Sequence, residues 1–157
     1  GYEPLIGGWN LTDVAITGNN GSLEGQADLW WPMHQTAPGL VAGRPHAVLF
    51  SRCQRVLLSN ITIRDSPFWS VRLWHSRHIT AANLTITATR STFNNDGIDV
   101  DSSGDVLIEN LNYDGGDDAV VGASDDALGT GLLVTRRSTN LPREEQIGDL
   151  LRLERVT

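Results

Sequence analysis

The chain has 157 residues, a length typical of one domain, and its formal net charge is −7 at pH 7. All 12 basic residues are arginines, and no apolar run is long enough to cross a bilayer. We therefore expect neither a nucleic-acid partner nor a membrane partner, since both polyanionic surfaces favour a basic protein. Cys53 is the only cysteine, which excludes an internal disulfide and a metal site built from cysteines.

The first third of the chain combines one strand pattern with irregular segments. Residues 10–17 alternate apolar and polar side chains and are followed by the turn-forming residues 18–21, which predicts a strand that ends in a turn. We expect residues 1–9 to be irregular. We expect residues 24–47 to form a long loop, because prolines and tryptophans interrupt any periodicity there.

A repeat becomes visible further along the chain. Residues 55–63, 78–86 and 105–113 share one pattern of Val, Ile and Leu, and the corresponding positions Val56, Ile79 and Val106 are 23 and 27 residues apart. Repeats of this length without a helical half predict an all-β fold, a short right-handed parallel β-helix. Shorter apolar runs complete each turn of this solenoid, at residues 48–50, 68–73, 98–100 and 119–121.

An asparagine occurs at the same position of each repeat. We expect Asn60, Asn83 and Asn110 to take the left-handed turn conformation and to stack as a ladder. Asn60 and Asn83 also begin N-x-Thr sequons, and we favour the structural interpretation over glycan attachment.

The repeat weakens after residue 121. Residues 132–134 could form a short strand, and residues 142–157 fit a helix or, as we prefer, a strand of the repeat. We expect a single β-helix domain over residues 1–157, with residues 132–157 as an atypical C-terminal coil or cap. An uncapped solenoid end would favour end-to-end self-association.

Three carboxylates are spaced like one turn of the solenoid. Asp117 and Asp118 follow Asp96 by 21 and 22 residues, which places them on adjacent turns, about 4.8 Å apart. Neighbouring strand residues point to opposite faces, so Asp117 and Asp118 converge only if the backbone bends, as the glycines at 115 and 116 permit. Repulsion raises the pKa of at least one carboxyl in such a cluster, which supplies the acid that glycoside hydrolysis needs beside an ionised carboxylate.

The motifs around these residues resemble glycoside hydrolase family 28, the polygalacturonases and their relatives. Asn94, Asn95 and Asp96 correspond to the family's Asn-Thr-Asp motif, and residues 116–118 correspond to its Gly-Asp-Asp motif. The resemblance extends from residue 4 to about residue 122 and includes three further segments: Arg-Pro-His at 44–46, Cys-Gln-Arg-Val at 53–56 and Ser-Pro-Phe-Trp at 66–69.

The resemblance implies a secreted or periplasmic enzyme, although no signal-peptide pattern is present in this chain. Such an enzyme would hydrolyse the α-1,4-galacturonosidic bonds of pectin with inversion and without a cofactor or metal. Asp117 would be the general acid, Asp96 and Asp118 would orient the attacking water, and Asn94 would supply a supporting hydrogen bond.

An anionic substrate requires a local basic patch on this acidic protein. Arg64, Arg72 and Arg90 flank the expected site strands and are the candidates, and Trp69 is a candidate for stacking on a sugar ring.

Two other functions compete with hydrolysis. The family also uses a Gly-His-Gly and an Arg-Ile-Lys motif, whereas here the last histidine is His78 and lysine is absent, which would suit an impaired polysaccharide-binding β-helix or a fragment. Residues 99–105 resemble the start of a calcium loop, but Asn110 stands where a bidentate glutamate is expected, so we disfavour calcium.

Overall fold

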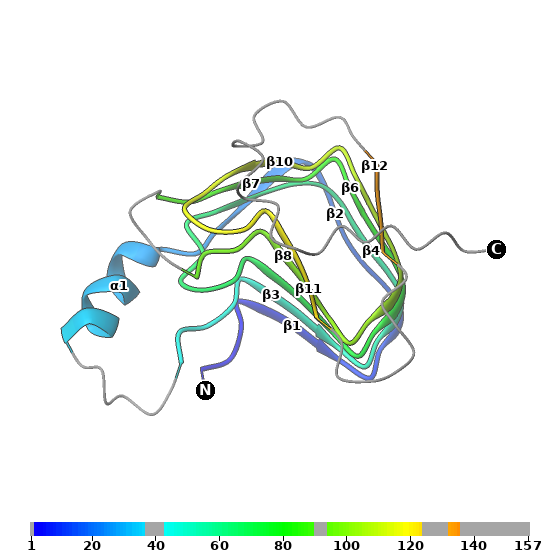
Figure 1. The fold of residues 1–157 in the computed structure, drawn as a ribbon, viewed down its shortest axis with the longest axis horizontal. Helices are drawn as coiled ribbons and strands as arrows, with labels where there is room; N and C mark the ends of the chain where they lie inside the picture. The colour runs from blue at the N-terminus through cyan, green and yellow to red at the C-terminus, as the bar shows by residue number, and fades with distance from the viewer. Residues whose placement is uncertain (1, 37–42, 90–93, 124–131, 136–157) are drawn as a thin grey trace.

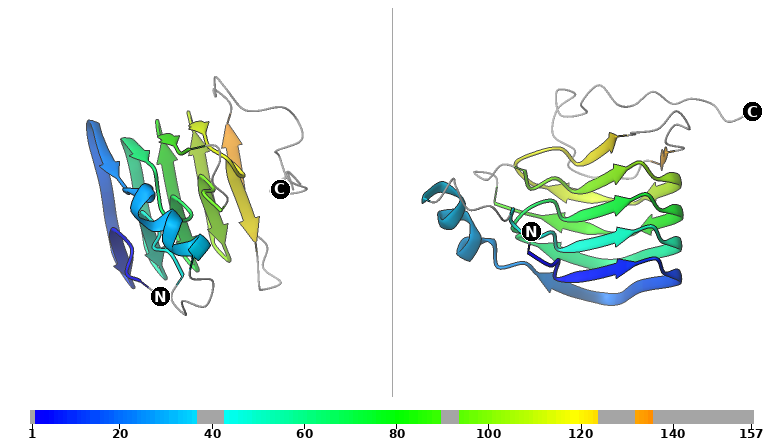
Figure 2. Two further views of the ribbon diagram at one scale, coloured as in Figure 1. Left: turned by 90° about the vertical axis from the view of Figure 1, so that its left-hand side faces the viewer. Right: turned by 90° about the horizontal axis from the view of Figure 1, so that it is seen from below.

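The computed structural model describes residues 2–36, 43–89, 94–123 and 132–135. They form the predicted right-handed parallel β-helix, in which short strands stack turn upon turn (Figures 1 and 2). Each turn is called a rung below.

The strands form a five-stranded and a seven-stranded parallel sheet. The five-stranded sheet, here called face 1, has the order β1 (Ile6–Trp9), β3 (Val48–Ser51), β5 (Val71–Trp74), β8 (Ile98–Asp101) and β11 (Val120–Ala123). The seven-stranded sheet contains β2 (Thr12–Glu24), β4 (Gln54–Arg64), β6 (Arg77–Ala82), β7 (Thr85–Thr87), β9 (Gly104–Glu109), β10 (Asn112–Asp114) and β12 (Leu132–Thr135).

The seven-stranded sheet bends into two further faces. The first parts of β2 and β4 pair in series with β6, β9 and β12, which we call face 2. The last parts of β2 and β4 pair with β7 and β10, which we call face 3. Three faces enclose the core, and within the described residues each of the first four rungs contributes a strand segment to every face.

The inward residues of successive rungs are stacked apolar side chains. Val48 pairs in register with Val71, which pairs with Ile98, and all three are fully buried. Because every rung removes similar apolar area from water, burial of the repeated Val, Ile and Leu side chains stabilises the whole stack.

The asparagine ladder is confirmed. Asn60, Asn83 and Asn110 have φ values of 55°, 54° and 52°, the left-handed conformation that asparagine tolerates. The Asn83 amide donates to Oδ1 of Asn60 at 3.2 Å, and the Asn110 amide donates to Oδ1 of Asn83 at 2.9 Å. These residues turn the chain from face 2 into face 3, so we call this the asparagine corner.

Three expectations for the first 47 residues are wrong. A helix, α1 (Ala27–Thr36), interrupts the expected loop, although Pro32 inside it removes a helical hydrogen bond and masked the pattern. β1 lies in the segment expected to be irregular, because pairing with β3 selects an extended chain despite two glycines. The expected turn at 18–21 is a register shift between Thr17 and Gly21 within β2.

The other strand predictions for the described residues agree with the structure, except that β5 begins at Val71, later than the predicted run at 68–73. β12 begins at Leu132 and pairs with β9 as a fifth rung, as expected for a short strand there. The helix-or-strand alternative for residues 142–157 lies outside the described residues. None of the described helices has the length and apolar character of a membrane span.

Candidate active site

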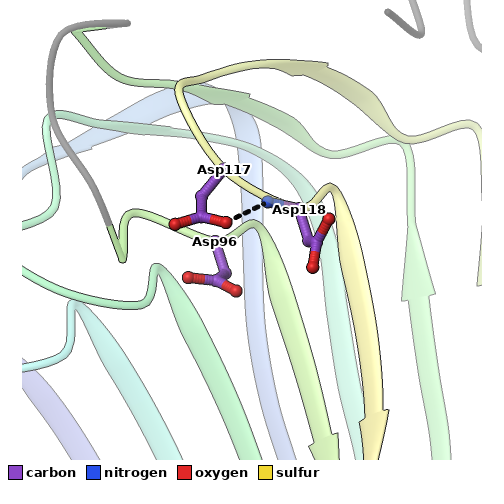
Figure 3. A group of neighbouring side chains, drawn as sticks. All are labelled: Asp96, Asp117 and Asp118. Atoms are coloured by element: carbon purple, nitrogen blue, oxygen red, sulfur yellow. Dashed lines mark hydrogen bonds between the residues drawn. The ribbon is translucent and has the colours of Figure 1, made fainter. Parts of the chain in front are cut away.

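The three carboxylates lie together where face 3 passes into face 1 (Figure 3). We call this the catalytic corner. The Ser70 amide donates to the Asp96 carbonyl at 2.8 Å, and the Gly97 amide donates to the Asp118 carbonyl at 2.9 Å. Asp118 therefore sits one rung beyond Asp96, and the predicted placement of Asp96 and the aspartate pair on adjacent rungs is confirmed.

A buried tyrosine holds the bend that brings Asp117 into the corner. The Tyr113 hydroxyl donates to the Asp117 carbonyl at 2.9 Å, and the Asp117 amide donates to that hydroxyl at 3.3 Å. A side chain at residue 115 would begin 2.2 Å from this hydroxyl oxygen, so Gly115 is required for space as much as for flexibility. The sequence analysis missed Tyr113 because its position reads as one more apolar residue of the repeat.

Asn95 links the rung of Asp96 to the rung of Asp117 and Asp118. Its side chain is fully buried, and its Oδ1 accepts from the Gly116 amide at 3.1 Å. The Asn95 carbonyl also lies 3.3 Å from the Tyr113 hydroxyl. The backbone on both sides of the carboxylates is therefore fixed by side chains of the same corner.

Two backbone amides fix the side chain of Asp117. The Asn94 amide donates to its Oδ2 at 2.8 Å, and the Asp118 amide donates to its Oδ1 at 3.1 Å, the bond drawn in Figure 3. Asn94 thus contacts the trio through its backbone amide, and its expected role in supporting the reaction stays a prediction.

The environment of the trio favours protonation of Asp96. Its side chain is buried, and desolvation with the charges of Asp117 and Asp118 raises its pKa to about 6. Burial and the charge of Asp117 also raise the pKa of Asp118. One oxygen from each carboxylate lies within 4.8 Å of the others, and oxygens this close could also share a hard cation.

A fourth carboxyl, Asp99, belongs to this corner and was not predicted as a site residue. It points to the outer side of β8, as its alternation with Ile98 and Val100 indicated, but only 4% of it is exposed. Burial raises its pKa to about 9, the charge of Asp96 adds to the increase, and Arg72 opposes it. Asp99 and Asp101 lie within β8, in a strand rather than the calcium-loop geometry that residues 99–105 resemble.

Arg72 is the one predicted arginine that the described structure brings to the corner. Its guanidinium lies 5.2 Å from the ring centroid of Trp69 and 5.0 Å from that of Trp74. It also pairs with Asp101, with 2.5 Å between Nη2 and Oδ2. Arg64 is exposed at the end of β4, two strands from β10, and Arg90 lies outside the described residues.

Comparisons with known proteins agree with the fold and identify the family. The model of the glycosyl hydrolases family 28 matches residues 2–128. A Vitis vinifera protein named probable polygalacturonase is 40% identical over 119 residues, which make up 76% of this chain and 24% of that protein. The chain thus spans about a quarter of that relative's length.

Two solved structures are similar to this chain. The hyperthermoactive exopolygalacturonase of Thermotoga maritima has a TM-score of 0.69 and 31% identity, over 78% of this chain and 35% of that one. The family 28 exopolygalacturonase of Yersinia enterocolitica, with a TM-score of 0.66 and 18% identity over 78% of this chain and 29% of that one, supports the fold. With two aspartate motifs on adjacent rungs of a parallel β-helix, the chain belongs to glycoside hydrolase family 28.

Proposed function

We propose that this chain carries the catalytic corner of a polygalacturonase-type glycosidase, which hydrolyses α-1,4-galacturonosidic bonds of pectin outside the cytoplasm. The observation that carries the proposal is the meeting of Asp96, Asp117 and Asp118 on adjacent rungs, with one oxygen of each within 4.8 Å. A glycosidic bond breaks when one carboxyl protonates the leaving oxygen and another activates water.

Asp117 is assigned the role of general acid. Its carboxyl is held in one orientation by the amides of Asn94 and Asp118, and a fixed orientation is what proton transfer to a leaving oxygen requires. In the chain without substrate, Asp96 has a pKa of about 6 and holds the cluster's proton below that pH. Delivery through Asp117 therefore involves redistribution of that proton within the coupled trio.

Asp96 and Asp118 are assigned to the attacking water. A water molecule that donates hydrogen bonds of about 2.7 Å to two carboxylate oxygens can bridge oxygens up to roughly 5 Å apart. The separation within the trio meets that condition. Such a water lies beside Asp96 and Asp118, and its direct attack on the sugar inverts the configuration at the anomeric carbon. The oxygens of the trio are closer together than the roughly 6.5–9.5 Å usual between the two carboxyl groups of inverting glycosidases.

Arg72 and Trp69 are assigned to the substrate. Trp69 precedes β5 by the same two residues by which Asp96 precedes β8, so its ring lies one rung from the trio. Arg72 supplies positive charge beside Asp99 and Asp101 and against Trp69, which favours a galacturonate carboxylate on this acidic protein.

The test is reducing-sugar release from polygalacturonate by the chain and by Asp117→Asn prepared in the same way. We expect release by the first and loss of at least about 100-fold in the second, since general-acid catalysis contributes roughly 10²–10⁴-fold. Equal release by both would overturn the assignment. Binding of the polymer without release from either would favour a polysaccharide-binding β-helix, the function suggested by the absent Gly-His-Gly and Arg-Ile-Lys motifs.

A further inference from the structure

One arginine and two aspartates lie side by side on the outer side of face 1. Arg72 on β5 pairs in register with Asp99 on β8, and Asp101 lies two residues further along β8. Residues two apart on a strand project from the same side, so the three side chains share one surface. Arg72 therefore has two carboxyl groups within its neighbourhood, one directly opposite and one diagonal to it.

The guanidinium of Arg72 pairs with the diagonal carboxylate, Asp101. Its Nη2 lies 2.5 Å from Oδ2 of Asp101, and the two side chains are only 26% and 18% exposed. The Ser102 hydroxyl donates to the other oxygen of Asp101, Oδ1, at 3.2 Å. Both oxygens of Asp101 are thus engaged, and loss of one partner from a pair so sheltered from water would leave the other charge uncompensated.

The opposite pair, Arg72 and Asp99, is not joined in this way. Within the described part of the chain, Nε of Arg72 and Oδ2 of Asp99 are both buried and make no hydrogen bond. One of these atoms is a donor, and the other is an acceptor once Asp99 is ionised. Burial raises the pKa of Asp99 to about 9, so at pH 7 its carboxyl is neutral and offers Arg72 no charge. Arg72 and Asp99 are therefore neighbours that could form an ion pair and do not.

Two tryptophan rings complete the surroundings of the guanidinium. Its central carbon lies 5.2 Å from the ring centroid of Trp69 and 5.0 Å from that of Trp74. The charge is felt on the Trp69 side, because burial and the charge of Arg72 lower the pKa of His46, whose ring lies 5.5 Å from that of Trp69, to about 4. The pair with Asp101 thus holds a cation beside the ring that is assigned to the substrate.

We propose that Asp101 is a positioning residue, which holds the guanidinium of Arg72 beside Trp69 for a substrate carboxylate and keeps it from pairing with Asp99. This inference rests on the proposed function, in which Arg72 contacts the substrate. Without Asp101, the guanidinium turns to Asp99, which ionises because a neighbouring cation favours the charged form of a carboxyl. An arginine neutralised by a buried partner attracts an anionic sugar less strongly.

A double-mutant cycle on polygalacturonate is the first test. Arg72→Gln should raise KM about 10-fold and leave kcat within about twofold, because it removes a contact made equally before and during the reaction. Asp101→Asn should raise KM about 3- to 10-fold with the same small effect on kcat, and Asp101→Glu should recover part of the loss. The combined variant should be no worse than Arg72→Gln alone. Additive effects would show that Asp101 acts without Arg72 and would overturn the inference.

The melting temperature between pH 6.5 and 8.5 is the second test, and it needs no substrate. Asp96, Asp101, Asp117 and Arg72 are the charged groups that face Asp99. Since the folded pKa of Asp99 is about 9, the wild-type melting temperature falls across this range. In Asp101→Asn the fall should vanish, because Asp99 is already ionised opposite Arg72. It should return in the combined variant, which lacks the guanidinium. An Asp101→Asn slope equal to that of the wild type would overturn the inference.

Asp13→Asn is the matched control, because it makes the same chemical change in another arginine–aspartate pair. Asp13 pairs with Arg55 on face 2, where both side chains are exposed, so neither KM nor the melting slope should change. A wild-type chain that neither binds nor hydrolyses polygalacturonate would refute the proposed function together with the substrate role of Arg72. An active wild type with an unchanged slope in Asp101→Asn would refute the inference alone.

Discussion

Two corners of this solenoid differ in how their side chains repeat from one rung to the next. At the asparagine corner, three rungs repeat one residue, and its side chains satisfy one another as a ladder. At the catalytic corner, equivalent positions hold His46, Trp69, Asp96 and Asp118, so that no rung repeats its neighbour with the same chemistry except the two aspartates. In a repeat protein, a position that keeps the same residue on successive rungs stabilises the stack. A position whose residue changes from rung to rung faces a ligand.

The strongest test of this comparison separates the roles of the aspartates. On polygalacturonate, Asp96→Asn and Asp117→Asn should both lower kcat by roughly 10²–10⁴-fold, because each removes an acid–base group. On an aryl galacturonide with a good leaving group, Asp117→Asn should recover most activity, since that leaving group needs no proton. Asp96→Asn should stay inactive, because water activation is still missing.

The aryl substrate also decides whether the assignments are exchanged. Recovery in Asp96→Asn instead of Asp117→Asn would make Asp96 the general acid, in line with its raised pKa in the free chain. Both rates are measured as release of the aryl alcohol over time.

A second, smaller effect is expected at Tyr113, which links the regular core to the irregular corner. Tyr113→Phe removes the hydroxyl that contacts the Asn95 carbonyl and the Asp117 peptide. We expect a loss of about 1–3 kcal/mol in the free energy of unfolding, because buried partners are left unsatisfied. We also expect kcat/KM to fall about 10-fold, because Asp117 is less firmly positioned.

Urea unfolding and initial rates on polygalacturonate measure these two effects. Tyr2→Phe is the control, since Tyr2 is 46% exposed and precedes the first strand, β1. A Tyr113→Phe chain that is less stable but fully active would mean that the bend at Asp117 is maintained by Asn95 and the backbone alone.

The sequence predicted the repeated part of the molecule better than the departures from it. The period of Val56, Ile79 and Val106 was enough to place β4, β6 and β9 side by side, because in a solenoid each rung contacts only its neighbours. α1 could not be predicted in the same way, since it occurs once and contains a proline. Its position depends on contacts with the Asp65 segment that no local pattern records.

The site was predictable as far as spacing determined it. One period separates Asp96 from Asp118, so adjacency followed from the repeat. The burial of Asp99 did not follow, because alternation gives the side of the sheet but not what covers that side. The alignment of His46 and Trp69 with Asp96 became visible only once the register between rungs was known.

Asp99, beside the catalytic corner, makes the free energy of unfolding depend on pH. Its pKa is about 9 in the folded chain and near 3.8 when exposed, so the folded state binds a proton that the unfolded state releases. The contribution of Asp99 to the free energy of unfolding is complete below pH 3.8, its pKa in the unfolded chain. That contribution is lost as the pH rises towards about 9, its pKa in the folded chain. Between pH 6.5 and 9, His46 and Asp96 no longer make the stability depend on pH. The folded and unfolded pKa values are about 4 and 6.5 for His46 and about 6 and 3.8 for Asp96, so all of them lie at or below 6.5.

In that window, the melting temperature of the wild-type chain should fall by several degrees, and that of Asp99→Asn should fall less. The groups that face Asp99 are Asp96, Asp101, Asp117 and Arg72, and all four are kept in the variant. Melting curves at pH 6.5, 7.5 and 8.5 measure the two slopes. Parallel slopes would show that Asp99 is ionised in the folded chain.

The smallest effect is expected from breaking the asparagine ladder. Asn83 donates to Asn60 and accepts from Asn110, so its removal breaks two hydrogen bonds that are exposed and worth about 0.5–1 kcal/mol each or less. Asn83→Gly removes the side chain and keeps the φ of 54° accessible, whereas Asn83→Ala adds a conformational strain of roughly 1 kcal/mol. Urea unfolding should therefore rank wild type above Asn83→Gly, and Asn83→Gly above Asn83→Ala. Activity should be unchanged in both, because this corner shares only the backbone stack with the carboxylates. A loss of activity without a loss of stability would mean that the two corners are coupled, and that repetition along one edge helps set the spacing of the rungs at the other.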